Sequence, residues 1–321
     1  MTMTRRTALT AGLTALVFPL LPVRLMAQET PQPQPRTAPG AILGEGPLWA
    51  SRENRIYWVD IRGKVLHRLD LASGEQLAWP MPGMIGWIVE RQQGGFLVGI
   101  DRSIFAIDMA SGTPSLTHVL DIESDQPDNR LNDAKVDAQG RLWTGTMHMP
   151  FSQKTAALYR IDADLSVHRM DAPYICTNGP AFNVAGTRLY HNETAEGIVY
   201  VFDLAGDGSL SNKRDFATFT QAEGYPDGMT TDAQDGLWVA LNNGGAIIRL
   251  NPDGSRDYTI TMPARQVTSL TFAGDRLERL FVTTAAQPPV AAGDSLAGTM
   301  FEVPVGLLRG HGGLATNLFA G

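Results

Sequence analysis

Short apolar runs recur at a nearly constant interval through most of this chain. Six of them begin 40, 46, 47, 48 and 43 residues apart and occupy residues 56–59, 96–99, 142–145, 189–192, 237–240 and 280–283. A second set follows after a polar turn, at residues 65–69, 104–107, 158–161, 199–202, 247–250 and 300–303. Gly-rich or Asp-rich corners separate the runs, and no helical periodicity lies between them. We therefore predict that the runs are β-strands.

A repeat of this length, with several short strands in each copy, is typical of the blades of a β-propeller. A single blade cannot bury both of its faces, and a closed ring gives every blade a neighbour on each side. The repeats thus predict an all-β fold, a six-bladed β-propeller. A two-sheet β-sandwich is the alternative at this strand density, but it does not explain why one spacing recurs six times.

Four repeats carry an oxygen-bearing side chain at the same phase. Glu45 in GEGPLW, Asn132 in RLND, Asn178 in TNG and Asp227 in PDG lie 11, 10, 11 and 10 residues before Ile56, Leu142, Leu189 and Leu237. The other two repeats have small residues there, near Gly86 and near Thr268 and Ser269. Taken singly, each of the four is also an ordinary turn former. The first strand of a blade lies nearest the axis, so together they predict a hard-cation site of two carboxylates and two amides at the channel mouth.

Composition and charge limit the classes of partner and site that the chain is expected to have. Gly 33, Pro 20 and 18% charged residues in a chain of 321 fit a turn-rich β protein. The net charge of −7 gives no reason to expect nucleic acid or an anionic membrane as a partner, and favours a small, neutral substrate. A single cysteine, Cys176, excludes an intramolecular disulfide, and we interpret it as a small buried hydrophobe. No HxxxH or CxxC spacing indicates a zinc site of nitrogen and sulfur ligands.

The N-terminal residues 1–27 have the pattern of a targeting segment. Arg5 and Arg6 precede an apolar stretch, and Leu25-Met26-Ala27 is typical of a cleavage site. The paired arginines predict a twin-arginine signal, and hence a periplasmic or secreted protein with no membrane partner after cleavage. An ordinary signal peptide or a retained anchor is the alternative. Residues 28–43 are proline-rich and predict a solvated linker, which leaves 44–321 for the propeller.

With these motifs together, the chain resembles the SMP-30/gluconolactonase/regucalcin family of six-bladed propellers. The resemblance covers about residues 44–319 and rests on five ordered motifs: GEGPLW, RLNDAKVDAQGRLWTGTM, TNGPAFNVAGTRLY, PDGMTTDAQDGLWVAL and VTSLTFAGDRLERLFVTTA. It implies one divalent cation bound by Glu45, Asn178 and Asp227. It also implies that Asn132 contacts water or substrate beside the cation, and that Arg130 contacts sugar hydroxyls. The cation is Ca²⁺, Mg²⁺, Mn²⁺ or Zn²⁺, and the oxygen ligands favour a hard ion.

The resemblance further implies hydrolysis of sugar lactones to aldonic acids. In this mechanism the cation polarises the lactone carbonyl, and Asp227 activates or orients water. Some members of the family carry an acid after the GTM motif, whereas residues 148–153 here contain none, so the choice of sugar stays open. Two other functions also remain. One is a metal-dependent esterase or phosphotriesterase, and the other is a non-catalytic propeller that binds calcium or another ligand. The oligomeric state is not predicted.

Overall fold

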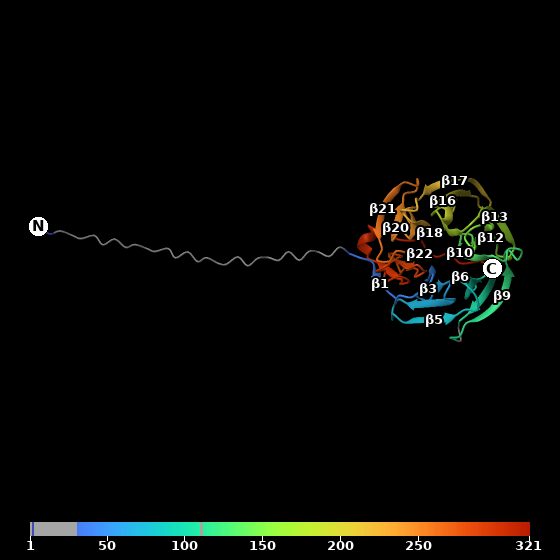
Figure 1. The fold of residues 1–321 in the computed structure, drawn as a ribbon, viewed down its shortest axis with the longest axis horizontal. Coiled ribbons are helices and arrows are strands. Elements are labelled where there is room, and N and C mark those ends of the chain that lie inside the picture. The colour runs from blue at the N-terminus through green and yellow to red at the C-terminus, as the bar shows by residue number, and fades with distance from the viewer. Residues whose placement is uncertain (1, 3–30, 110–111) are drawn as a thin grey trace. The chain divides into compact units, whose positions relative to one another are not determined.

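The computed structural model describes residue 2 and residues 31–109 and 112–321, so the predicted targeting segment 1–27 lies almost wholly outside the described residues. Residues Pro31–Gly321 form one compact unit. Its strands make six four-stranded antiparallel sheets arranged around a centre (Figure 1). In each sheet the strand that comes first in the repeat is innermost, and every innermost strand contacts the innermost strand of the next sheet until the ring closes. The predicted six-bladed β-propeller is therefore confirmed.

The bounds of the strands, from the innermost strand outward, are as follows. Blade 1 contains β2 (Gly44–Ala50), β3 (Arg55–Asp60), β4 (Val65–Asp70) and β5 (Gln76–Pro80). Blade 2 contains β6 (Ile85–Glu90), β7 (Phe96–Ile100), β8 (Ser103–Asp108) and β9 (Ser115–Asp121). Blade 3 contains β10 (Asn129–Val136), β11 (Leu142–His148), β12 (Ala156–Ile161) and β13 (Val167–Tyr174).

Blade 4 contains β14 (Thr177–Phe182), β15 (Arg188–Glu193), β16 (Ile198–Leu204) and β17 (Leu210–Thr218). Blade 5 contains β18 (Tyr225–Thr231), β19 (Leu237–Asn242), β20 (Ala246–Leu250) and β21 (Arg256–Thr261). Blade 6 contains β22 (Val267–Ala273), β23 (Arg279–Thr284), β24 (Phe301–Val303) and β1 (Gln34–Pro35). The helices of the described residues are two short 3₁₀ turns, η1 (Thr194–Glu196) and η2 (Val305–Leu308). Neither of them is long and apolar enough to cross a membrane.

The outermost strands are the elements that the apolar pattern does not predict. All twelve predicted runs coincide with second or third strands, and the second strands are largely buried. The fourth strands β5, β9 and β17 are mostly exposed or half-buried, so their side chains are polar and resemble loops in the sequence. Main-chain hydrogen bonding to the third strand holds them in the sheet.

The segment 28–43, which the sequence predicts to be a solvated linker, contributes an exposed edge strand at Gln34 and Pro35 that completes blade 6. Gln34 and Pro35 pair with Glu302 and Phe301 of β24. Arg36 N then donates to Met300 O at 2.8 Å. Proline is tolerated on an edge strand, where its missing N–H costs no ladder hydrogen bond. The N-terminal strand therefore closes the ring alongside the C-terminal strands, and a proline-rich composition does not exclude that role.

The C-terminal residues 312–321 cross the end of the channel opposite the predicted site. Gly313 N donates to Leu277 O of blade 6, and Phe319 N donates to Glu90 O of blade 2. Phe319 is fully buried in the apolar cluster between blades 2 and 3. The tail residues 314–317 form the floor of a channel cavity of about 310 Å³. All six blades thus line this cavity, and the tail covers it at the end away from the predicted site.

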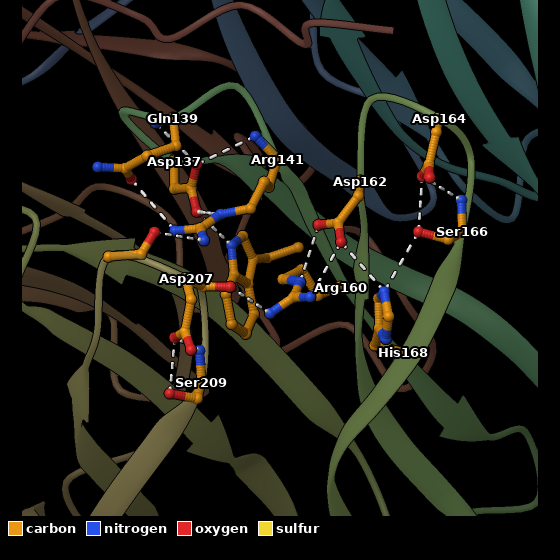
Figure 2. A network of polar contacts seen from close by, with 12 residues as sticks. Asp137, Gln139, Arg141, Arg160, Asp162, Asp164, Ser166, His168, Asp207 and Ser209 are labelled. Atoms are coloured by element: carbon orange, nitrogen blue, oxygen red, sulfur yellow. Dashed lines mark hydrogen bonds and ion pairs between the residues drawn. The ribbon is translucent and has the colours of Figure 1, made fainter.

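A buried aspartate organises the turn between the first and second strands in two of the blades. In blade 3, Asp137 accepts hydrogen bonds from Arg141 Nε at 2.7 Å and Trp143 Nε1 at 2.8 Å (Figure 2). The same arrangement occurs in blade 5, where Asp232 accepts from Trp238 Nε1 and Arg249 Nε, both at 2.7 Å. The related sequences DAQGRLW and DAQDGLW therefore encode the same Asp–Trp hydrogen bond, whereas the arginine comes from the turn in blade 3 and from β20 in blade 5. These acids belong to the scaffold.

Candidate active site

A β-bulge in each innermost strand sets the level of the site. The register shifts at Glu45/Leu48, Ile85/Trp87, Leu131/Ala134, Asn178/Ala181, Pro226/Met229 and Val267/Ser269. Gly46 and Gly179 have φ values of 50° and 48° in two of these bulges, a conformation that only glycine adopts readily. Each bulge lies at the same place in its strand. The predicted residues at or beside the bulges therefore occupy one level of the channel mouth.

Asn132 and Asn178 are in direct contact across blades 3 and 4. Asn132 Nδ2 donates to Asn178 Oδ1 at 2.9 Å and to Thr177 O at 2.7 Å. Asn178 Nδ2 in turn donates to Thr194 Oγ1 at 2.9 Å. Hydrogen bonds within the protein therefore fix the orientation of both amides. Two of the four residues predicted to converge are thus in contact.

Asp227 presents one carboxylate oxygen that has no partner. Its Oδ2 accepts from Asn242 Nδ2 at 2.9 Å, and its main-chain oxygen accepts from Asn192 Nδ2 at 2.5 Å. Among the described residues, Asp227 Oδ1 and Asn192 Oδ1 are both buried without a hydrogen-bond partner. Buried polar atoms normally have partners, so two unsatisfied oxygens at one place point to a bound group.

Two buried acids at the mouth repel each other. Burial raises the pKa of Asp227 to about 7, and the nearby Asp133 charge adds to the effect. Burial, followed by the charges of Asp227 and Asp133, raises the pKa of Glu45 well above its usual range. The charge of each of these two acids therefore acts on the other. Two buried carboxylates this close are costly unless they are protonated or paired with a cation.

Arg130 and Cys176 complete the surroundings of these acids. Arg130 is buried, and its Nη1 donates to Leu131 O at 2.9 Å. Burial lowers the pKa of Arg130, while the charges of Glu45 and Asp227 act to raise it. Cys176 is buried as predicted, and its Sγ lies 3.9 Å from Asn132 Nδ2 and 3.8 Å from Asn178 Nδ2. Burial raises the pKa of the Cys176 thiol, so it is a protonated, poorly nucleophilic group.

The donor set suits a hard divalent cation. Glu45 and Asp227 supply carboxylate oxygens, and Asn178 supplies an amide oxygen, which are the ligand types that Ca²⁺ and Mg²⁺ prefer. The described residues contain no cluster of three or more His, Cys, Asp and Glu side chains that could hold a metal ion. This site differs from such clusters because amides contribute part of the donor set. The unpartnered Asp227 Oδ1 is the structural observation that fits a cation most directly.

The sequence patterns missed four residues around the site: Asp133, Asn192, Thr194 and Asn242. Asn192 and Asn242 lie at the mouth ends of β15 and β19, where each apolar second strand becomes polar. That change from apolar to polar residues is the signal that could have identified them. Asp133 was adjacent to a predicted residue, and its Oδ2 accepts from Gly179 N at 3.0 Å, which fixes the loop that carries Asn178.

Residues 43–286 match the family described as SMP-30/Gluconolactonase/LRE-like region. The chain belongs to this family. A relative named 6-deoxy-6-sulfogluconolactonase, from Pseudomonas putida, is 32% identical over 285 residues, which cover 88% of this chain and 96% of the relative. An L-arabinolactonase from Azospirillum brasilense is 32% identical over 286 residues, or 87% and 92% of the two chains. The solved structure of a calcium-binding protein, regucalcin, from Agrobacterium tumefaciens has a TM-score of 0.82 at 27% identity, covering 90% of this chain and 97% of that one.

The raised pKa of Asp227 predicts how this SMP-30-family protein responds to pH without divalent cations. A group whose pKa is higher in the folded state stabilises the fold fully below its unfolded pKa near 4, and that stabilisation is lost as the pH rises through about 7. Asp227→Asn keeps the neutral form, so the cation-free variant should exceed the wild type in free energy of unfolding by about 4 kcal/mol at pH 8. Urea titrations should show this difference vanish near pH 4. A constant difference across this range would contradict the assignment.

Proposed function

We propose that this protein hydrolyses sugar lactones to aldonic acids and requires one divalent cation held by Glu45, Asn178 and Asp227. The observation that carries the proposal is the buried, unpartnered Asp227 Oδ1 beside a second buried carboxylate and an oriented amide oxygen. Membership of the family and the lactonase names of two relatives support the substrate class. One structural neighbour, regucalcin, is described as a calcium-binding protein, and this supports calcium among the candidate cations.

The proposed reaction assigns a separate role to each group of the site. When bound, a divalent cation supplies Lewis-acid polarisation of the lactone carbonyl and stabilises the negative charge that develops on its oxygen. Asn242 fixes the Asp227 carboxylate, which would ligate the cation through Oδ1 and orient the water and accept its proton through Oδ2. The water oxygen bonds to the carbonyl carbon, the ring C–O bond breaks, and the proton passes to the ring oxygen. The product is an open hydroxy acid.

Asn132 and Arg130 would position the sugar. Both amide hydrogen bonds of Asn132 are made through Nδ2, so its Oδ1 remains an acceptor for a sugar hydroxyl or a water molecule. Arg130 uses Nη1 for the main chain, and its remaining N–H groups are suited to sugar oxygens. Neither role is needed to bind a cation alone. These groups therefore favour an enzyme over a non-catalytic calcium-binding propeller.

Removal of divalent cations tests the proposal. We expect chelation to lower the rate of D-glucono-1,5-lactone hydrolysis at least about 100-fold, because the developing oxyanion loses its main stabilising charge. Restoring Ca²⁺, Mg²⁺, Mn²⁺ or Zn²⁺ one at a time should recover activity with at least one of them. An aryl ester and an organophosphate in the same assay distinguish a lactonase from the esterase and phosphotriesterase alternatives. Full lactonase activity in the chelated protein would overturn the cation requirement.

We also propose that residues 1–27 direct export as a twin-arginine signal, so that the mature protein is periplasmic or secreted. The proposal rests on Arg5-Arg6, the apolar stretch that follows and the small-residue cleavage pattern. Cell fractionation of the wild type and an Arg5→Lys/Arg6→Lys variant measures it. Accumulation of both proteins in the same compartment would contradict this assignment.

A further inference from the structure

Asn192 presents a buried amide oxygen that accepts no hydrogen bond from the described part of the chain. The side chain is fully buried, and its Oδ1 has no partner among residues 31–109 and 112–321. An amide oxygen hidden from water normally accepts at least one hydrogen bond, because leaving it unsatisfied costs free energy. The protein therefore leaves this oxygen free to bind a donor or a cation.

Asn192 lies beside two of the three residues that are proposed to hold the cation. Its Nδ2 donates to the main-chain oxygen of Asp227 at 2.5 Å. Asn192 is also the register partner of Asn178 across β14 and β15. Directly opposite residues of an antiparallel pair share one face, with Cβ atoms about 4.5–5.5 Å apart. The Asn192 amide therefore lies at the level of the Asn178 amide, next to Asp227.

The hydrogen bond to Asp227 decides which end of the Asn192 amide stays free. A main-chain oxygen only accepts, so the Nδ2 end is fixed toward it and Oδ1 is the free atom. Asp227 adds its own unpartnered Oδ1 in the same part of the site. Both free atoms are thus acceptors, and one belongs to a carboxylate. Buried acceptors that meet without a donor are unfavourable unless a positive charge lies among them.

Accepting the proposed lactonase function and its cation, we propose that Asn192 Oδ1 is a fourth protein ligand of that cation, beside Glu45, Asn178 and Asp227. Ca²⁺ takes about six to eight oxygen ligands, and asparagine carbonyl oxygens are among them. A fourth oriented amide would fill one of these positions without adding negative charge. It would also favour Ca²⁺ over Mg²⁺, which keeps several water molecules and binds few protein groups.

Calorimetric titration of full-length variants with Ca²⁺ tests this role. Asn192→Leu removes the free oxygen and also the donor to Asp227, and the Ca²⁺ affinity should fall at least about tenfold. Asn192→Asp also lacks the donor at neutral pH, but it keeps an oxygen ligand and adds a negative charge. Its Ca²⁺ affinity should equal or exceed that of the wild type. A residue that only anchored the Asp227 main chain would lose affinity equally in both variants, and this result would overturn the proposal.

Asn129→Leu is the matched control, because Asn129 is also buried but both ends of its amide have partners. Its Nδ2 donates to Glu123 Oε2 and its Oδ1 accepts from Thr155 Oγ1, both at 2.7 Å. Thermal melts of the cation-free protein should show a loss of stability, because two buried groups are left unpaired, while the Ca²⁺ affinity stays within about twofold of the wild type. An equal loss of affinity in Asn129→Leu and Asn192→Leu would mean a general disturbance of the mouth and would overturn the proposal.

A crystal structure of the wild type with bound Ca²⁺ gives a second readout that does not depend on any variant folding. Asn192 Oδ1 should lie within about 2.3–2.6 Å of the ion. An ion held by Glu45, Asn178 and Asp227, with Asn192 Oδ1 beyond about 3.5 Å and bonded only to water, would overturn the fourth ligand and leave the lactonase proposal intact. If the wild type bound no divalent cation in calorimetry, the proposed function itself would lose its cation.

Discussion

Asp227→Asn should lower kcat/KM for lactone hydrolysis about 1,000-fold and remove measurable cation binding with it. The substitution preserves the shape of the side chain and an acceptor oxygen, but it removes a negative ligand and the acceptor for the water proton. Loss of one such electrostatic group costs about 100- to 1,000-fold, and loss of a proton acceptor adds to this. Initial rates and calorimetric titration with Ca²⁺ or Mn²⁺ measure the two effects on one preparation.

Asp275→Asn is the matched control for this experiment. Asp275 is exposed on the turn after β22, away from the mouth, and the substitution removes the same charge. Its rate and cation affinity should equal those of the wild type. A thermal melt of the cation-free Asp227→Asn protein separates loss of chemistry from loss of folding. If this variant kept a tenth of the wild-type rate with normal cation affinity, Asp227 would have neither proposed role.

Asp232→Ala should lower the free energy of unfolding by about 3–5 kcal/mol, the largest effect expected from a residue outside the site. Asp232 is 0% exposed and Arg249 is 4% exposed. The carboxylate accepts hydrogen bonds from Arg249 and Trp238, and its removal leaves a buried guanidinium with Asp257 as its remaining partner. Breaking one side of a buried ion pair is costly because the other charge is left uncompensated.

Urea unfolding of three variants tests this account of the scaffold. Asp137→Ala should be destabilised to a similar extent, because Asp137 holds Arg141 and Trp143 in the same way. Asp232→Ala/Arg249→Met should be more stable than Asp232→Ala alone, because no uncompensated charge remains. A loss below about 1 kcal/mol in Asp232→Ala would show that the ion pair contributes little.

The Asp232–Arg249 ion pair also contributes to the loss of stability of the fold in acid. Burial acts to raise the pKa of Asp232, but hydrogen bonds from Arg249 and Trp238 outweigh it and lower that pKa. A lowered carboxyl pKa gives stability that is present above the unfolded value near 4 and is lost as the pH falls below it. This contribution therefore weakens in acid, in the opposite direction to that of Asp227 in the cation-free protein.

The fold and the level of the site could be predicted from the sequence because they depend on repetition. Six buried second strands, of which residues 56–59 are the first, give a spacing that only a closed ring explains well. The polar fourth strands and β1 could not be predicted, because an edge strand is held by main-chain hydrogen bonds to its neighbour rather than by burial of its own side chains. The motif residues at the bulges were recognisable for the same reason as the strands, since they recur at one phase.

The contacts within the site depend on pairings that a single repeat does not encode. Asn192 reaches Asp227 from the second strand of the preceding blade, 35 positions away in the chain. Such residues become visible only when the register of the strands and the order of the blades are known.

The most direct test of the central claim is the position of a bound cation. Crystals of the protein grown with Mn²⁺ and measured at an anomalous wavelength should show one strong peak within about 2.0–2.6 Å of an oxygen of Glu45, Asn178 and Asp227. A peak at another place in a crystal whose protein hydrolyses lactones, with these three side chains turned away from a common point, would contradict the account.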